Sequence, residues 1–153
     1  MADTVRLGLD WGKARIGVAA ANEGTSFAYP VETVQAGPDE LRRLAAIVAE
    51  YEPGLIYVGL PLTLSGERAL AAEYVLAKAA ALAGAVAPIP VRLVDERMST
   101  VSASRSLGSA GRRAKQQRQV IDQAAAVDIL QRALDLEERV GTPAGEPAPR
   151  EAT

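Results

Sequence analysis

The chain has 153 residues and a net charge of −2, so it has room for one domain with a proper core, and its overall charge does not indicate a nucleic-acid partner. It contains no cysteine and no histidine, which excludes disulfides, thiolate nucleophiles, Cys-based zinc sites and histidine acid–base chemistry. Any acid–base or metal chemistry therefore falls mainly to carboxylates, whose oxygens select hard cations such as Mg²⁺ or Mn²⁺. A binding module without chemistry is the alternative.

No segment has the character of a membrane span or a signal peptide. The first residues lack the basic start and long apolar run of a signal peptide. The most apolar stretch, residues 76–91, is interrupted by Lys78, Gly84, Pro88 and Pro90. We expect a cytoplasmic protein that does not partner a membrane.

The first part of the chain predicts three antiparallel strands. Residues 5–9 form a short apolar run that stops at Asp10, and residues 15–21 form a second. Residues 26–34 are the third, with Pro30 favouring the edge of the sheet.

The rest of the chain alternates helices and strands. Apolar residues change to helical spacing after Gly37, and a later unbroken apolar run is typical of a strand buried on both faces. The first elements expected here are a helix over residues 39–51, a strand over 55–58, a helix from about 67 to 83 and a strand over 91–94. Two helices follow: one capped by Ser99 or Thr100 that ends at about residue 107, and a long one from about 119 to 139.

These elements predict an α/β fold in one domain, residues 1–140. Its five-stranded mixed sheet has three antiparallel strands followed by two parallel ones, and helices flank it. Residues 141–153 are rich in Pro and Gly and poor in apolar side chains, which predicts a disordered tail.

Two candidate acids follow predicted strands. Asp10 ends the first strand, where loops open a crevice on a rigid sheet, although an Asp that only starts a turn is the alternative. Glu96 ends the fifth strand beside Asp95, which has the opposite parity. Parity alone does not choose between these two acids, and a surface acid paired with Arg97 is a further interpretation.

Asp122 is the most informative candidate because it falls on the apolar face of the last helix. That face is formed by Ala125, Ala126, Ile129, Leu130, Ala133 and Leu134. A carboxylate facing the sheet is costly unless it is paired or binds a cation. The alternative is a first-turn Asp favoured by the helix dipole. Asp128 and Asp135 lie on the opposite face, where we expect them to be solvated.

Acids from two strand ends and one helix can meet at one point and ligate one or two divalent ions, which suits phosphodiester hydrolysis. An acid-free stretch, residues 105–118, favours phosphate contact over a generic solvated loop. Its basic residues are Arg105, Arg112, Arg113, Lys115 and Arg118. Trp11 is the only aromatic residue near Asp10 in sequence and is a candidate for base stacking.

Four segments together resemble the YqgF/RuvX family of Holliday junction resolvases and ribosomal RNA precursor nucleases. They are LGLDWGKARIGVA at 7–19, VGLPLTLSG at 58–66, VDERMST at 94–100 and VIDQAAAVDIL at 120–130. They stand in the family's order and span nearly all of the chain except the tail.

The resemblance implies an RNase H-like fold related to the RuvC resolvase. It implies Asp10, Glu96 and Asp122 as catalytic metal ligands, with Arg15 and Arg97 supporting the site or contacting phosphates. It also matches the basic residues at 112–118, which here are diluted by Ala114, Gln116 and Gln117. RuvC relatives use a further acid, for which Asp128 is the local candidate despite its solvated face.

The function implied is metal-dependent endonuclease activity on branched DNA or a structured rRNA precursor, with a homodimer expected for a symmetric junction. The turn at Asp10, Trp11 and Gly12 also resembles the Asp-x-Gly turn of actin- and hexokinase-like ATPases. Those enzymes need two such domains to clamp a nucleotide, and this chain has room for one. The alternative is a non-catalytic binding protein, a ribosome- or RNA-associated factor whose acidic residues are structural.

Overall fold

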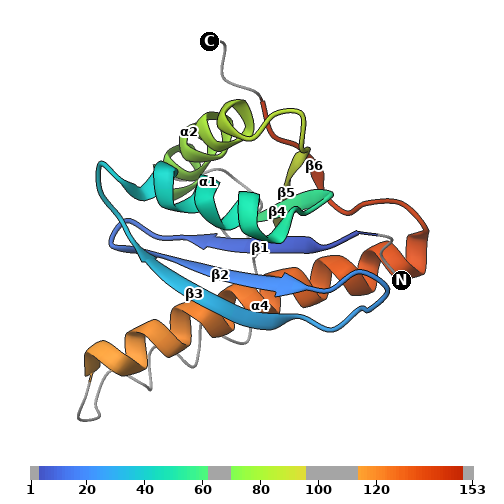
Figure 1. The fold of residues 1–153 in the computed structure, drawn as a ribbon, viewed down its shortest axis with the longest axis horizontal. Helices are drawn as coiled ribbons and strands as arrows, with labels where there is room; N and C mark the ends of the chain where they lie inside the picture. The colour runs from blue at the N-terminus through green and yellow to red at the C-terminus, as the bar shows by residue number, and fades with distance from the viewer. Residues whose placement is uncertain (1–3, 62–69, 96–113, 150–153) are drawn as a thin grey trace.

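A mixed sheet in the order β3-β2-β1-β4-β5-β6 forms the centre of the molecule (Figure 1). The computed structural model describes residues 4–61, 70–95 and 114–149. The strands are β1 Arg6–Trp11, β2 Arg15–Ala21, β3 Tyr29–Gln35, β4 Leu55–Leu60, β5 Val91–Asp95 and β6 Glu146–Pro147. The first three strands are antiparallel, β4 runs parallel to β1, and β5 runs parallel to β4. The predicted mixed sheet is therefore confirmed.

The described sheet has six strands rather than the five predicted. The additional strand, β6, lies in the segment expected to be a disordered tail and pairs antiparallel with β5. The side chain of Arg92 explains why this segment has a defined structure. Its Nε and Nη2 donate to the carbonyl oxygens of Ala144 and Gly145, each at 2.6 Å. A two-residue strand containing a proline has no alternating pattern that the sequence could reveal.

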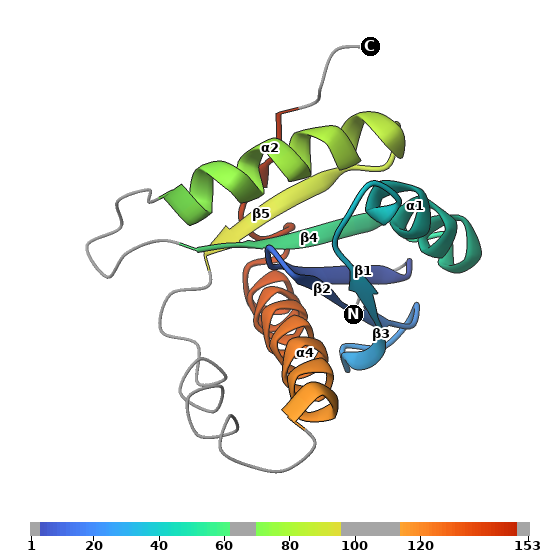
Figure 2. The same cartoon turned by 90° about the vertical axis from the view of Figure 1, so that its left-hand side faces the viewer.

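Helices cover both faces of the sheet, as Figure 2 shows. The helices are α1 Glu40–Tyr51, α2 Leu70–Ala85 and α4 Ala114–Val140. Helices α1 and α2 lie on one face, and α4 crosses the other. Helix α4 begins at residue 114 rather than at about 119, and the helix expected to end near residue 107 lies outside the described residues. Within the described ranges, no helix is long and apolar enough to cross a membrane.

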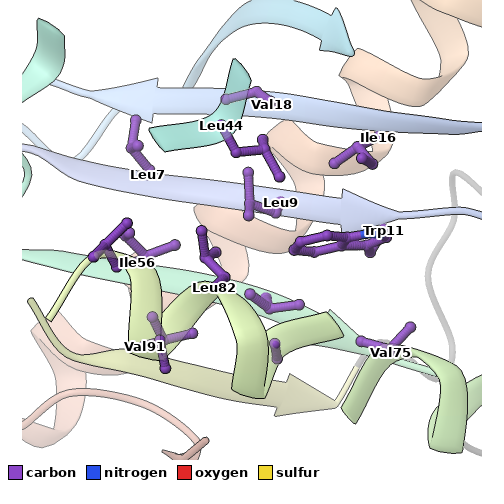
Figure 3. Close-up of a cluster of buried hydrophobic side chains, with 14 of the residues drawn as sticks. Leu7, Leu9, Trp11, Ile16, Val18, Leu44, Ile56, Val75, Leu82 and Val91 are labelled. Atoms are coloured by element: carbon purple, nitrogen blue, oxygen red, sulfur yellow. The ribbon is translucent and has the colours of Figure 1, made fainter. Parts of the chain in front are cut away.

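Strand β1 is buried on both faces, and successive side chains along it point alternately to the two faces of the sheet. Leu7, Leu9 and Trp11 join the core beneath α1 and α2 (Figure 3). Gly8 and Asp10 therefore face α4. A Cβ on Gly8 would lie 2.6 Å from the Leu130 Cβ, so α4 packs against the bare backbone of the central strand.

A buried polar cluster fixes the carboxyl-terminal end of α4. The fully buried Tyr57 hydroxyl donates to Glu137 Oε2 at 2.9 Å and accepts from the Ala144 N–H at 3.0 Å. Arg6 Nη2 donates to Glu137 Oε1 at 2.6 Å. Burial raises the pKa of Tyr57 to about 12. Burial also acts to raise the pKa of Glu137, but hydrogen bonds from Arg6 and Tyr57 outweigh it, and the pKa of Glu137 is lowered.

Removing the Tyr57 hydroxyl should destabilise the fold. Tyr57→Phe leaves the buried Ala144 N–H and one Glu137 oxygen without this partner, so we expect a loss of about 1–3 kcal/mol in the free energy of unfolding. Urea denaturation measures the free energy of unfolding of the wild type and the variant. The matched control is Tyr29→Phe, whose hydroxyl makes an exposed hydrogen bond to Asn22. Equal losses in the two variants would contradict the cluster's role.

The lowered pKa of Glu137 predicts a pH dependence of stability. Because the folded-state pKa lies below the ordinary glutamate value of 4.5, the contribution is complete above that pH and disappears as pH falls through the folded-state pKa. Glu137→Gln should therefore weaken the loss of stability between pH 5 and pH 3 in thermal unfolding. The exposed neighbour Glu138→Gln is the control, and an identical pH profile in both variants would refute the linkage.

Candidate active site

Asp10 lies near the carboxyl end of β1, on the face covered by α4. Its side chain is 7% exposed, and its residue pairs across the sheet with Gly17 of β2. Strands β1, β4 and β5 run parallel, so their carboxyl ends lie at one edge of the sheet. This is the position that the sequence predicted for Asp10.

Helix α4 touches the sheet beside Asp10 because Gly17 has no side chain. A Cβ built on Gly17 would lie 2.0 Å from the carbonyl oxygen of Asp122, which no structure tolerates without a shift. The backbone of α4 at Asp122 therefore rests on the residue that pairs with Asp10. Two of the three predicted acids, one from a strand and one from a helix, are brought to the same end of one sheet face.

The buried-face position of Asp122 is confirmed, and its partner is Arg15. Arg15 Nε donates to Asp122 Oδ2 at 2.6 Å, and the Asp122 side chain is 15% exposed. The position of Asp122 on the apolar face predicted that its carboxylate needs a positive partner, and Arg15 provides one. Burial alone therefore does not require a metal at Asp122. The sequence suggested a supporting role for Arg15, but no spacing rule predicts this contact across 107 positions.

The third predicted acid, Glu96, lies outside the described residues. Asp95 is exposed at the end of β5 and shares its parity with Val91 and Leu93, which join the core beneath α1 and α2. Val94 instead packs in the core beneath α4. The α4 face of β5 is thus the face of Arg92 and Val94. Within the described ranges, no three acidic side chains gather as a metal site.

Strand β4 carries a glycine, Gly59, between β1 and β5 on the α4 face. Leu9 pairs with Val58, so Asp10 and Gly59 are neighbours one residue further along, and Gly59 pairs with Val94. Gly59 shares the parity of Tyr57, which packs beneath α4. Gly59 is buried and places no side chain beside Asp10 on this face.

Other predicted residues have mixed outcomes. Trp11 is 4% exposed and buried beneath α1 and α2, so the hypothesis that it stacks on a base is wrong. Asp128 is partly exposed and lies 3.9 Å from Arg132 one turn along α4. Arg97, Arg112 and Arg113 lie outside the described residues, and of Lys115 and Arg118 only the helical backbone is described.

Comparisons with known proteins identify the family. The profile of the RuvX family, described as Holliday junction resolvase, matches residues 4–136. The chain therefore belongs to the RuvX family, a family of nucleases.

Several bacterial relatives carry the printed name "Putative pre-16S rRNA nuclease". The Cutibacterium acnes protein is 55% identical over 131 residues, which cover 86% of this chain and 82% of that protein. The Thermobifida fusca protein is 50% identical over 151 residues, covering 93% and 94%. The Mycobacterium tuberculosis protein is 54% identical over 142 residues, covering 92% and 82%.

Among solved structures, Thermus thermophilus RuvC matches with a TM-score of 0.56 at 20% identity, covering 94% of this chain and 99% of that one. The same enzyme in complex with a Holliday junction substrate matches with a TM-score of 0.55 at 19% identity, with the same coverage. This likeness confirms the predicted RuvC-related fold.

The approach of α4 to β2 makes Gly17 intolerant of substitution. In Gly17→Ala the added methyl group meets the Asp122 backbone, so α4 must shift away from the sheet. We expect a loss of about 1–3 kcal/mol in stability and a changed NMR environment at Asp122. An alanine variant with wild-type stability and unchanged Asp122 resonances would contradict this packing.

Proposed function

We propose that this chain hydrolyses phosphodiester bonds in nucleic acid, with Asp10, Asp122 and Glu96 holding Mg²⁺ or Mn²⁺. The observation that carries the proposal is the contact of α4 with Gly17, which brings the Asp122 backbone against the strand residue that pairs with Asp10. Membership of the RuvX family supports the same chemistry. For a nuclease of this family we propose a cytoplasmic location.

The residues present suit a hard divalent ion. The donors are carboxylate oxygens, which Mg²⁺ and Mn²⁺ prefer, and Gly59 places no side chain beside Asp10. Asp95 shares its parity with Val91 and Leu93, on the face away from Asp10, so we propose Glu96 rather than Asp95 as the third ligand. Asp128 has Arg132 as a neighbour and is proposed to stay outside the ligand set.

Each residue then has a separate task. Bound divalent ions would activate a water, neutralise the phosphate and stabilise the leaving oxygen. Asp10 is fixed by a strand that is buried on both faces, which limits its movement. Arg15 holds Asp122 through Oδ2, so Oδ1 can face a ligand. The guanidinium group has five N–H donors and uses one on Asp122, so the others can contact a phosphate.

The proposed substrate is a structured rRNA precursor. The relatives at 50–55% identity carry the name of a pre-16S rRNA nuclease, which favours this substrate. Branched DNA is the second candidate, favoured by the family's description as Holliday junction resolvase. A symmetric junction would call for a homodimer with two sites. We propose that phosphates are contacted by Arg15, Arg97, Arg112, Arg113, Lys115 and Arg118.

Substituting either described acid should abolish cleavage without unfolding the protein. Asp10→Asn and Asp122→Asn keep side-chain size but weaken metal ligation, so we expect activity to fall by roughly 100-fold or more, about 2.7 kcal/mol of transition-state stabilisation. Matched pre-16S rRNA, four-way junction, duplex DNA and single-stranded RNA are incubated with Mg²⁺ or Mn²⁺. The control is Asp39→Asn, an exposed acid near the start of α1.

The pattern of cleavage decides between the functions. Preferential cleavage of the rRNA precursor supports the first substrate, and preferential cleavage of the junction supports the second. Equal residual cleavage by wild type, Asp10→Asn and Asp122→Asn would indicate a contaminant and overturn the proposal. Binding of RNA without metal-dependent cleavage by the wild type would support the non-catalytic alternative.

A further inference from the structure

A buried charged cluster lies behind Asp10, on the opposite face of β1. Glu40, the first residue of α1, is 6% exposed, although glutamates are rarely buried. Its Oε1 accepts the Gly37 N–H at 2.9 Å, and its Oε2 lies 2.9 Å from Lys78 Nζ of α2. Burial acts to raise the pKa of Glu40, but the Gly37 N–H, Lys78 and Trp11 outweigh it and the pKa is lowered. Glu40 is therefore a buried carboxylate.

The indole of Trp11 completes this cluster. In the described part of the chain, two buried side-chain atoms lack a well-formed hydrogen bond: Trp11 Nε1, and Glu40 Oε2, whose 2.9 Å contact with Lys78 Nζ is an ion pair without good hydrogen-bond geometry. One is a donor and the other an acceptor, and the Trp11 indole is the smallest of the contributions that lower the pKa of Glu40. Figure 3 shows Trp11 on the same side of β1 as Leu9.

Helix α2 also contacts the turn that follows Trp11. Two ammonium groups lie near the Tyr74 ring, with Lys78 Nζ 5.4 Å and Lys13 Nζ 5.8 Å from its centroid. Lys13 belongs to the turn between β1 and β2, which is closed by a hydrogen bond from the Gly12 N–H to the Arg15 carbonyl at 2.9 Å. Both ends of this turn carry residues of the candidate site, Asp10 before it and Arg15 after it.

We propose that Glu40 is a positioning residue, which acts through Trp11 and with Lys78 to fix the turn between β1 and β2 and thereby the Asp10 carboxylate. This inference rests on the proposed function of Asp10 as a metal ligand. A buried ion pair contributes little stability compared with apolar packing, so its use here is to hold geometry. Glu40 does not reach the α4 face, and its effect on the site is transmitted by the strand.

Two variants test the inference in the full chain. Glu40→Gln removes the charge but keeps an amide of similar size, and Trp11→Phe keeps an aromatic ring but removes the N–H. Both should raise the dissociation constant for Mn²⁺, measured by titration calorimetry, by roughly 10-fold, the size of effect typical of groups that orient metal ligands. Glu32→Gln is the matched control, because Glu32 pairs with Arg43 of α1 and belongs to no contact described for Trp11.

The single tryptophan supplies a second readout that does not depend on metal or cleavage. Its fluorescence comes from Trp11 alone, so Glu40→Gln should shift the emission while Glu32→Gln leaves it unchanged. A wild-type Mn²⁺ dissociation constant in both Glu40→Gln and Trp11→Phe, with folding intact, would overturn the positioning role. An unchanged Trp11 emission in Glu40→Gln would overturn the contact itself. A wild type that binds Mn²⁺ without cleaving any substrate would contradict the proposed nuclease function, while a raised dissociation constant in the variants would still support the positioning role.

Discussion

The contact between Gly17 of β2 and the backbone of α4 at Asp122 governs the arrangement of the candidate site. A helix normally stands away from a sheet by the thickness of the side chains between them. Here one position has no side chain, and the Asp122 carbonyl oxygen lies where a Cβ would be. Asp122 is thereby placed beside the strand pair that carries Asp10, and Arg15 of the same strand as Gly17 binds its carboxylate. Helix position and carboxylate orientation thus depend on two residues of β2.

The two faces of β1 serve different purposes. The α4 face holds Gly8, which lets the helix pack against the bare backbone, and the Asp10 carboxylate proposed to bind metal. The opposite face carries Leu7, Leu9 and Trp11 into the larger core. The buried carboxylate of Glu40 belongs to that second face. A strand held from both sides can present a carboxylate with little freedom, which is what metal ligation at a fixed geometry requires.

The order of elements and the positions of Asp10 and Asp122 followed from the sequence, because strand ends and helical spacing are local patterns. Strand β2 was predicted to its exact bounds, and the inward face of Asp122 followed from helical spacing. The partner of Asp122 did not follow, since an ion pair between residues 15 and 122 depends on how the helix crosses the sheet. Strand β6 could not be predicted from a hydrophobic pattern either. Its segment is held by hydrogen bonds from Arg92 rather than by its own side chains. The base-stacking hypothesis for Trp11 rested on its nearness to Asp10 in sequence, but neighbouring strand residues point to opposite faces, and Trp11 lies in the core.

The most direct test of the central claim is a crystal structure of the wild-type protein grown with Mn²⁺, with anomalous diffraction collected at the manganese edge. The account predicts a peak bound by carboxylate oxygens of both Asp10 and Asp122 at about 2.1 Å, with Arg15 still on the other Asp122 oxygen. A peak that contacts neither carboxylate, or no peak at saturating Mn²⁺, would contradict it.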